Sequence, residues 1–324
     1  MLYIIPQFPV LNRYPEDWIR WLDLEFSRHY KGSFEILMGL NTPKPYTFND
    51  INKFTDTEST ISYELQQLDS LFKKKLLLND LVLFCDFDFP GFSSSAAFLL
   101  RTLYPTIKLY GFIHATSVNY LDFWNLVSDS KFFAEKGSFS ILDGIFVATN
   151  YHKNKLSVFN VDSKIYVVGC PFFSEEIPNL AKDWLVRKWD IFIPARHVDQ
   201  KLSGVDLDFA KVKISDGELY SRKHYYETMG NSKICLSLAQ EETFGYSVLE
   251  AISLGAIPVV PDKYSYPELV SEVNLRYSNF SDMKFKINSI LNGEDWVDYR
   301  IKLNCDLFKW ENSFKNLISI LEGN

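Results

Sequence analysis

The chain alternates short, continuous apolar runs with longer segments whose apolar residues recur at helical spacing. Leu2–Ile5, Asp80–Cys85 and Gly144–Ala148 are typical of the runs, and such runs indicate strands buried on both faces. Glu16–His29 is typical of the longer segments, because Trp18, Leu22 and Phe26 fall on one helical face. Strands and helices in alternation predict the α/β class, with a doubly wound parallel sheet.

The same pattern predicts the remaining elements. Further strands are predicted at Phe34–Met38, Lys108–Ile113, Ile165–Val168, Asp190–Pro194, Ile234–Leu238 and Ile257–Val260. Further helices are predicted at Thr57–Leu77, Phe92–Leu103, Tyr120–Val127, Lys131–Phe139, Asn150–Phe159, Ser221–Gly230, Ser247–Leu254, Met283–Leu291, Val297–Phe308 and Glu311–Leu321. Phe172–Arg187 is predicted to be a linker with an entry helix, and Asp206–Ser215 fits either a strand or a helix.

The most informative stretch surrounds Gln240–Leu269, where a strand, a polar turn, a helix and a second strand follow one another. Ser247 suits the N-cap of that helix, and Gly255 suits its C-cap. A βαβ unit of this kind requires the two strands to be parallel.

The turn of this unit lies where such sheets bind ligands, beyond the carboxyl ends of the strands. Backbone amides of Phe244, Gly245 and Tyr246 at the start of the helix favour an anion such as a phosphate. Glu242 and Glu250 can accept hydrogen bonds from hydroxyl groups. A ligand with both phosphates and hydroxyls, such as a nucleotide sugar, matches this mixture of groups.

The motif resembles the donor site of retaining GT-B glycosyltransferases of the family-4 kind. Glu242 and Glu250 are separated by seven residues, Phe244-Gly245 follows the first acid, and LEAISLGAIPVV completes the helix and strand. The resemblance implies that Glu242 lies by the transferred sugar and that Glu250 holds the ribose. It implies the donor-binding residues Phe244, Gly245, Tyr246, Ser247 and Glu250. The alternative is an ordinary βαβ unit with two surface acids.

A second motif matches the same family. Arg196 and Lys201 follow the strand Asp190–Pro194, where the family places an Arg and a Lys that hold the donor diphosphate. A forked guanidinium and an ammonium can neutralise the charge of a diphosphate. An Arg–Lys pair on a loop is, on its own, more often a solvated pair.

His114 follows the predicted strand Lys108–Ile113. Many GT-B enzymes place a His of the N-terminal domain against the sugar, so the resemblance implies that His114 joins Glu242 as a catalytic residue. A neutral imidazole can donate to or accept from a sugar hydroxyl. A purely structural histidine is the alternative.

The resemblance also implies the domain organisation, with two Rossmann-like domains whose parallel sheets face each other across a cleft. Residues 1–171 would form the acceptor-side domain and residues 172–310 the donor domain. Residues 311–324 would form a helix that crosses back to the N-terminal domain. The length of 324 residues suits two domains of about 150 residues each.

Composition narrows the class of protein. A hydrophobic content of 47% supplies a large core. The net charge of −7 argues against a protein that binds nucleic acid mainly through contacts to its phosphates. The four cysteines lack metal-ligand spacing and indicate reduced, buried thiols. With no signal peptide and no apolar run long enough to span a membrane, a cytoplasmic location is expected.

Asp86-Phe87-Asp88 is the one sequence feature that favours a metal. An Asp-x-Asp after a strand marks the metal site of the other large glycosyltransferase fold, and its oxygens suit a divalent ion. The donor motif already supplies another kind of site. We therefore expect no metal site, no required divalent metal and no cofactor, the nucleotide sugar being a substrate.

The acceptor is the least constrained part of the hypothesis. A glycan hydroxyl and a hydroxymethylated base in phage DNA are both compatible, and a DNA base would have to be reached in its stack. The candidate basic residues for a nucleic acid are Arg13, Arg20, Lys44 and Arg101. The alternatives are a non-catalytic nucleotide-sugar-binding protein and a nucleotide-sugar epimerase of the same fold.

Overall fold

The computed structural model describes residues 1–10, 14–40, 57–87, 89, 91–121, 128–177, 179–194, 207–215, 221–293 and 295–323. The chain divides into two compact units. Unit 1 comprises Met1–Pro171 and Ser313–Asn324, and unit 2 comprises Phe172–Asn312.

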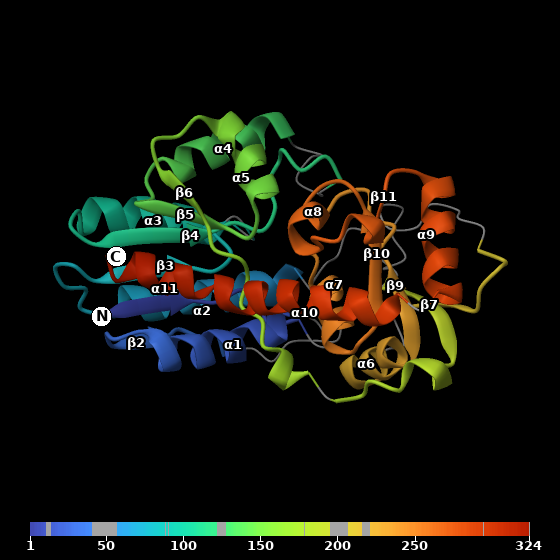
Figure 1. The fold of residues 1–324 in the computed structure, drawn as a ribbon. Helices are drawn as coiled ribbons and strands as arrows, with labels where there is room; N and C mark the ends of the chain where they lie inside the picture. The colour runs from blue at the N-terminus through green and yellow to red at the C-terminus, as the bar shows by residue number, and fades with distance from the viewer. Residues whose placement is uncertain are drawn as a thin grey trace. The chain divides into compact units, whose positions relative to one another are not determined.

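Unit 1 is built on a six-stranded sheet in the order β2-β1-β3-β4-β5-β6, in which every neighbouring pair is parallel. Its strands are β1 (Leu2–Ile5), β2 (Phe34–Ile36), β3 (Leu81–Phe84), β4 (Lys108–Phe112), β5 (Gly144–Val147) and β6 (Lys164–Val167). Its helices are α1 (Tyr14–His29), α2 (Thr57–Phe72), α3 (Phe92–Leu103), α4 (Ser128–Phe139), α5 (Asn150–Leu156) and α11 (Lys315–Leu321). Helices link successive strands, which confirms the predicted alternation (Figure 1).

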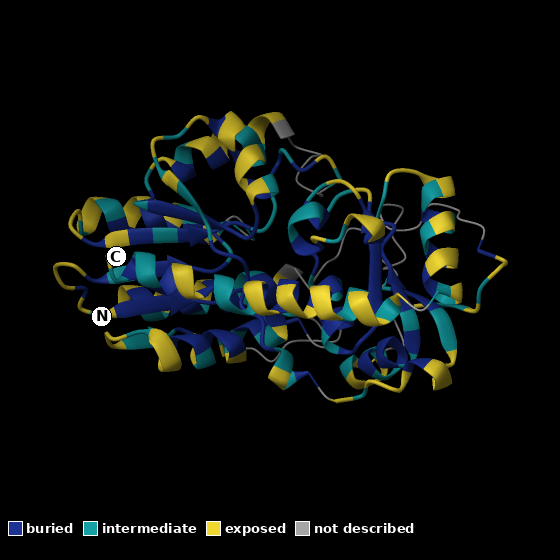
Figure 2. Ribbon diagram, viewed as in Figure 1, coloured by how far each residue is buried: buried dark blue, intermediate teal, exposed yellow. Residues whose placement is uncertain are grey.

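The core of unit 1 is rich in phenylalanine. Phe87 packs between Phe84 and Phe139, with ring centroids 5.5 and 6.4 Å apart, and all three side chains are at most 1% exposed. Figure 2 shows the central strands as buried and the outer helical faces as exposed, whereas the edge strands β2 and β6 are only partly buried. These large rings bury much apolar surface, which is the main stabilising contribution in a sheet covered by helices.

Unit 2 is built on a five-stranded sheet in the order β11-β10-β9-β7-β8, again with parallel neighbours. Its strands are β7 (Trp189–Ile193), β8 (Val212–Ile214), β9 (Ser232–Leu236), β10 (Ile257–Pro261) and β11 (Arg276–Tyr277). Its helices are α6 (Arg222–Gly230), α7 (Tyr246–Ser253), α8 (Tyr266–Leu269), α9 (Phe280–Asn292) and α10 (Trp296–Ser313).

Both sheets place their first strand between the second and the third. The connections therefore reverse direction beside that first strand, and ligands of doubly wound sheets bind at this switch point beyond the carboxyl ends. In unit 2 the switch point lies between β7 and β9. In unit 1 it lies between β1 and β3.

The predicted helix within Phe172–Arg187 is wrong. The segment contains two short 3-10 helices, Ser174–Glu176 and Trp184–Val186. Arg187 holds its end instead, because the guanidinium donates to the carbonyls of Lys182, Ser232 and Leu254 at 2.9, 2.6 and 3.2 Å. These tertiary bonds replace the backbone bonds of a helix.

Two further findings concern cysteines and membrane spans. Cys85, Cys170 and Cys235 are buried thiols as predicted, whereas Cys305 is exposed, which corrects the prediction for that residue. Within the described ranges, none of the helices combines the length and the apolar character that crossing a bilayer requires.

Candidate functional site

The segment Ser237–Gly245, called the donor loop below, connects β9 to α7 at the switch point of unit 2. Parallel pairing of β9 with β7 and β10 confirms the predicted βαβ unit. Glu242 lies in the middle of the loop and is partly exposed. The loop thus carries an acidic side chain at the edge of the sheet where a ligand is expected.

Gly245 ends the donor loop in the left-handed region, with φ 99° and ψ 62°, and is the N-cap residue of α7. The predicted N-cap at Ser247 is therefore wrong by two residues. A glycine turns the chain here at little cost, whereas other residues would be strained. The first amides of α7, at Tyr246 and Ser247, have no acceptor within the helix itself, and both residues are partly exposed.

The end of α7 agrees with the predicted glycine signal. Gly255 has φ 69°, its amide donates to Ile252 O at 2.9 Å, and the amide of Ala256 donates to Ala251 O at 2.8 Å. This pair of bonds is the Schellman motif, with glycine immediately after the C-cap residue.

The donor loop is fixed by the beginning of α8. Ser265, which is fully buried, donates from its amide to Glu242 O at 3.3 Å and from Oγ to Phe244 O at 3.0 Å. Tyr266 shares a hydrogen bond of 2.6 Å between its hydroxyl and Ser237 Oγ. Sequence reasoning missed both residues, because nothing in their local pattern shows that they contact a loop more than 20 positions earlier.

Phe244 anchors the loop with its side chain. The side chain is 5% exposed, and its ring meets Tyr246 and Trp310 edge-on at centroid distances of 5.0 and 5.5 Å. The ring therefore belongs to the core, and only the backbone of Phe244 can serve a ligand.

The Glu250 carboxylate, carried by α7, contacts the start of α6, and its side chain is 2% exposed. Arg222 donates to Oε1 at 2.6 Å, Tyr225 to Oε2 at 3.1 Å, and Tyr226 to Oε1 at 3.5 Å. Two carboxylate oxygens offer about four acceptor positions, so these bonds leave room for about one more donor. Glu250 is thus a pre-oriented acceptor in a largely dry setting.

The charge of Glu242 affects the ionisation of the Tyr266 hydroxyl. Burial and then the charge of Glu242 raise the pKa of the Tyr266 hydroxyl well above its usual value. Tyr266 therefore stays protonated, which keeps its hydroxyl available to donate beside the donor loop.

His114 follows β4 in unit 1, and its Nε2 lies 2.9 Å from Cys85 O. A carbonyl oxygen only accepts, so Nε2 carries the proton and Nδ1 is the acceptor of the neutral ring. Trp18 and Phe112 each pack on the imidazole at a centroid distance of 4.9 Å. Burial lowers the pKa of His114 to about 4, so the ring is neutral at physiological pH.

Several predicted residues lie outside the described residues, namely Arg13, Lys44, Asp88, Arg196 and Lys201. The segment that contains Arg196 and Lys201 follows β7, the neighbour of β9 at the switch point. Among the described residues no group of three or more His, Cys, Asp or Glu side chains could hold a metal ion.

Arg20 and Arg101, the described candidates for a basic nucleic-acid face, are engaged within unit 1. Arg20 pairs with Asp17 at 3.2 Å. Arg101 pairs with Asp143 at 2.6 Å and also donates to the Ile107 and Ile141 carbonyls. Arg101 therefore ties α3 to neighbouring loops.

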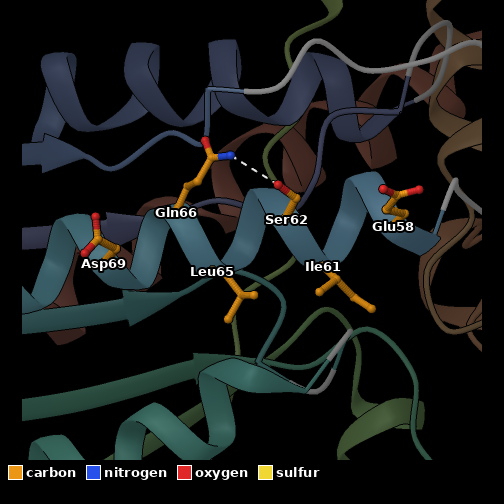
Figure 3. Close-up of a pocket in the computed structure, with 6 residues that line it drawn as sticks. All are labelled: Glu58, Ile61, Ser62, Leu65, Gln66 and Asp69. Carbon is orange, nitrogen blue, oxygen red and sulfur yellow. Dashed lines mark hydrogen bonds between the residues drawn. The ribbon is translucent and has the colours of Figure 1, made fainter.

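A hollow of about 720 Å³ lies along α2, lined by Glu58, Ile61, Ser62, Leu65, Gln66 and Asp69. Figure 3 shows Ile61 and Leu65 pointing the same way, while Gln66 donates to Ser62 Oγ on another side of the helix. None of the predicted site residues lines this hollow.

Comparison with known proteins finds a partial match to a curated enzyme. A stretch of 79 residues is 32% identical to the tRNA-queuosine alpha-mannosyltransferase of Drosophila melanogaster. The match covers 24% of this chain and 19% of that enzyme. No protein-family model matches the chain.

Solved structures match almost the whole chain. Sucrose-phosphate synthase from Thermosynechococcus elongatus superimposes with a TM-score of 0.63 at 12% identity, covering 99% of this chain and 97% of that one. A trehalose-6-phosphate synthase gives 0.65 at 11% identity, covering 100% and 99%. At such identities the likeness concerns the fold. The chain therefore has the GT-B fold of glycosyltransferases, with two Rossmann-like units, as its sequence resemblance predicts.

Proposed function

We propose that this protein is a glycosyltransferase that moves a sugar from a nucleotide-sugar donor to an acceptor hydroxyl, with retention and without a metal. The observation that carries the proposal is the donor loop at the switch point of unit 2, where Gly245 turns the chain into α7 and Glu250 of that helix is held by Arg222. This edge of the parallel sheet offers backbone amides and carboxylates. That combination suits a ligand with both phosphates and hydroxyls.

Each residue has a distinct part in the proposed reaction. Glu250 accepts hydrogen bonds from the ribose, Glu242 orients the transferred sugar, and the amides of Gly245 and Tyr246 contact the sugar and diphosphate. Arg196 and Lys201 hold the diphosphate. Fixed cations and amides stabilise the charge that develops on the leaving diphosphate, which is the main electrostatic requirement of such a transfer.

His114 supplies a neutral imidazole to a hydroxyl of the transferred sugar. Because Nε2 donates to Cys85 O, Nδ1 is the atom that accepts from the hydroxyl. Retention is supported by the likeness to the trehalose-6-phosphate synthase, whose structure was solved in a study of glycosyl transfer with retention.

The acceptor is a glycan hydroxyl or a modified base in nucleic acid. The name of the Drosophila relative gives a modified tRNA nucleoside as its acceptor, and this supports keeping nucleic acid in the proposal. The net charge of −7 favours the glycan, because binding to nucleic acid relies on cationic contacts to phosphates.

A thermal-shift panel tests the proposal directly. Uridine, guanosine, adenosine and thymidine diphosphates and their common sugar conjugates are added with and without magnesium. We expect one base to raise the melting temperature equally in both conditions, since ligand bound only to the folded state stabilises it. No shift with any nucleotide would refute the donor site, and a shift that needs magnesium would refute the metal-free proposal.

Analysis of the products formed from the nucleotide sugar that binds distinguishes a transferase from the alternative functions. Slow release of free sugar without an acceptor supports a transferase, with water as a poor acceptor. Conversion to an isomeric nucleotide sugar would point to an epimerase. Binding with no turnover, even with glycan and DNA acceptors supplied, would point to a non-catalytic nucleotide-sugar-binding protein.

A further inference from the structure

The loop that carries His114, residues 114–119, is held by a buried polar network that the proposed reaction does not use. Glu135 of α4 is 2% exposed and accepts from the Ser117 amide at 3.0 and 3.2 Å and also from Ser117 Oγ. Asn119 Oδ1 accepts from the Thr116 amide at 2.9 Å, and the Asn119 amide donates to Thr116 O at 2.9 Å. Thr116, Ser117 and Asn119 are each at most 3% exposed.

The same loop is tied at two further points. Lys155 of α5 donates from Nζ to Val118 O at 3.2 Å. His114 itself is bonded to Cys85 O at 2.9 Å. Contacts from three other parts of unit 1 thus converge on one short loop.

Glu135 is the buried carboxylate of this network. Burying a carboxylate is costly unless several donors satisfy it, and here Ser117, three positions after His114, supplies both an amide and a hydroxyl donor. Charge-assisted hydrogen bonds of this kind are stronger and geometrically stricter than neutral ones. We infer that Glu135 is a positioning residue for sugar transfer, fixing the loop so that the His114 imidazole keeps its orientation toward the sugar. This inference rests on the proposed function.

A matched control exists in the same unit. Glu64 of α2 is 4% exposed and accepts from the Ser93 amide at 2.7 Å and from Ser93 Oγ at 2.5 Å. It therefore holds the start of α3 with the same chemistry that Glu135 applies to Ser117. Glu64→Gln and Glu135→Gln remove the same kind of carboxylate, but only Glu135 bonds to the loop of His114 in the contacts described above.

The test compares both variants of the full chain in sugar release from the nucleotide sugar that binds best in the panel. Glu135→Gln should lower kcat about tenfold, because small misplacements of a reacting group are costly, with KM for the donor within about twofold. Glu64→Gln should leave kcat within about twofold. In a His114→Ala background, Glu135→Gln should cause no further loss, because its effect acts through His114. Equal losses in both backgrounds would overturn the inference.

A second readout does not depend on activity. The chain has five histidines, so the ring resonances of His114 can be assigned by NMR with single His→Gln variants. Glu135→Gln should shift the His114 resonances and Glu64→Gln should not. Unchanged His114 resonances would overturn the inference even if no donor binds. Absence of donor binding with shifted resonances would refute the proposed function and the role in sugar transfer, while still showing that Glu135 positions His114. If Glu135→Gln fails to fold, Ser117→Ala replaces it, because it removes the hydroxyl bond alone.

Discussion

Arg222 Nη2 lies 2.6 Å from Glu250 Oε1, and the Glu250 side chain is 2% exposed. Removing one partner of a buried ion pair leaves an uncompensated charge. Arg222→Met should therefore lower the free energy of unfolding by about 3 kcal/mol, measured by urea denaturation at pH 7. The control is Lys223→Met, because Lys223 is 77% exposed and lies 3.9 Å from Glu227. Equal effects of both changes would show that the Arg222–Glu250 pair is unimportant for stability.

Glu250 should also contribute to donor binding. Glu250→Gln keeps the volume but loses the charge and one of the two acceptor oxygens. Under the proposed function, donor affinity should fall by about 1–3 kcal/mol, the size of hydrogen bonds lost to a charged group. Calorimetric titration of the nucleotide into the folded variant measures this. An unchanged Kd would remove Glu250 from the ribose site.

Gly245 should tolerate no side chain. Its φ of 99° strains any L-residue, and a Cβ there would lie 3.3 Å from Leu269 Cδ1 and 3.4 Å from Glu242 Cγ. Gly245→Ala should cost about 1–2 kcal/mol of stability and weaken donor binding as well. Gly137→Ala in α4 is the control, because nothing lies within 4 Å of the added Cβ. Comparable melting temperatures and affinities for the two variants would argue against a strained turn.

His114 should make the protein less stable in acid. Its folded pKa of about 4 lies below the ordinary value of about 6.5, so the unfolded chain binds more protons between these pH values. The free energy of unfolding attributable to His114 is thus constant above about pH 7 and falls as the pH drops toward 4. Denaturant unfolding of His114→Gln across this range should show a shallower loss than the wild type. Parallel curves would contradict the lowered pKa.

Glu25 of α1 should act in the opposite direction. Burial raises the pKa of its carboxyl to about 7, so the folded protein binds more protons than the unfolded chain between about pH 4.5 and 7. Its contribution to stability is present below pH 4.5 and is lost as the pH rises through 7. Glu25→Gln should therefore be more stable than the wild type at pH 8, by about 1–3 kcal/mol, and little different at pH 4.5. A stability difference that does not change with pH would contradict this.

The sequence predicts the parallel sheets well because buried strands such as Ile257–Val260 are continuous apolar runs. It does not reveal β11, since Arg276–Tyr277 is two residues long and polar in character. The helix of the donor motif, predicted over Ser247–Leu254, spans Tyr246–Ser253, and its start depends on the backbone conformation of Gly245 rather than on a capping side chain.

Only part of the candidate site can be predicted from the sequence, for a similar reason. Glu242, Glu250 and Gly245 stand in one local motif, which local spacing can reveal. Arg222 and Ser265 reach that motif only after folding, through bonds that span 28 residues to Glu250 and 21 to Phe244. Such partners have no local signature, so three-dimensional packing alone identifies them.

The return of the chain to unit 1 at Ser313 sets the order in which the protein can fold during synthesis. Helix α11 buries Leu317, Ile318 and Leu321, and Phe314 packs against Trp18 of α1 at 6.2 Å between ring centroids. Unit 1 therefore needs a segment that follows the whole of unit 2 in the chain to complete its core. Unit 2, whose residues are continuous, can mature in the interval, while the unfinished unit 1 is the stage most exposed to chaperones and proteases.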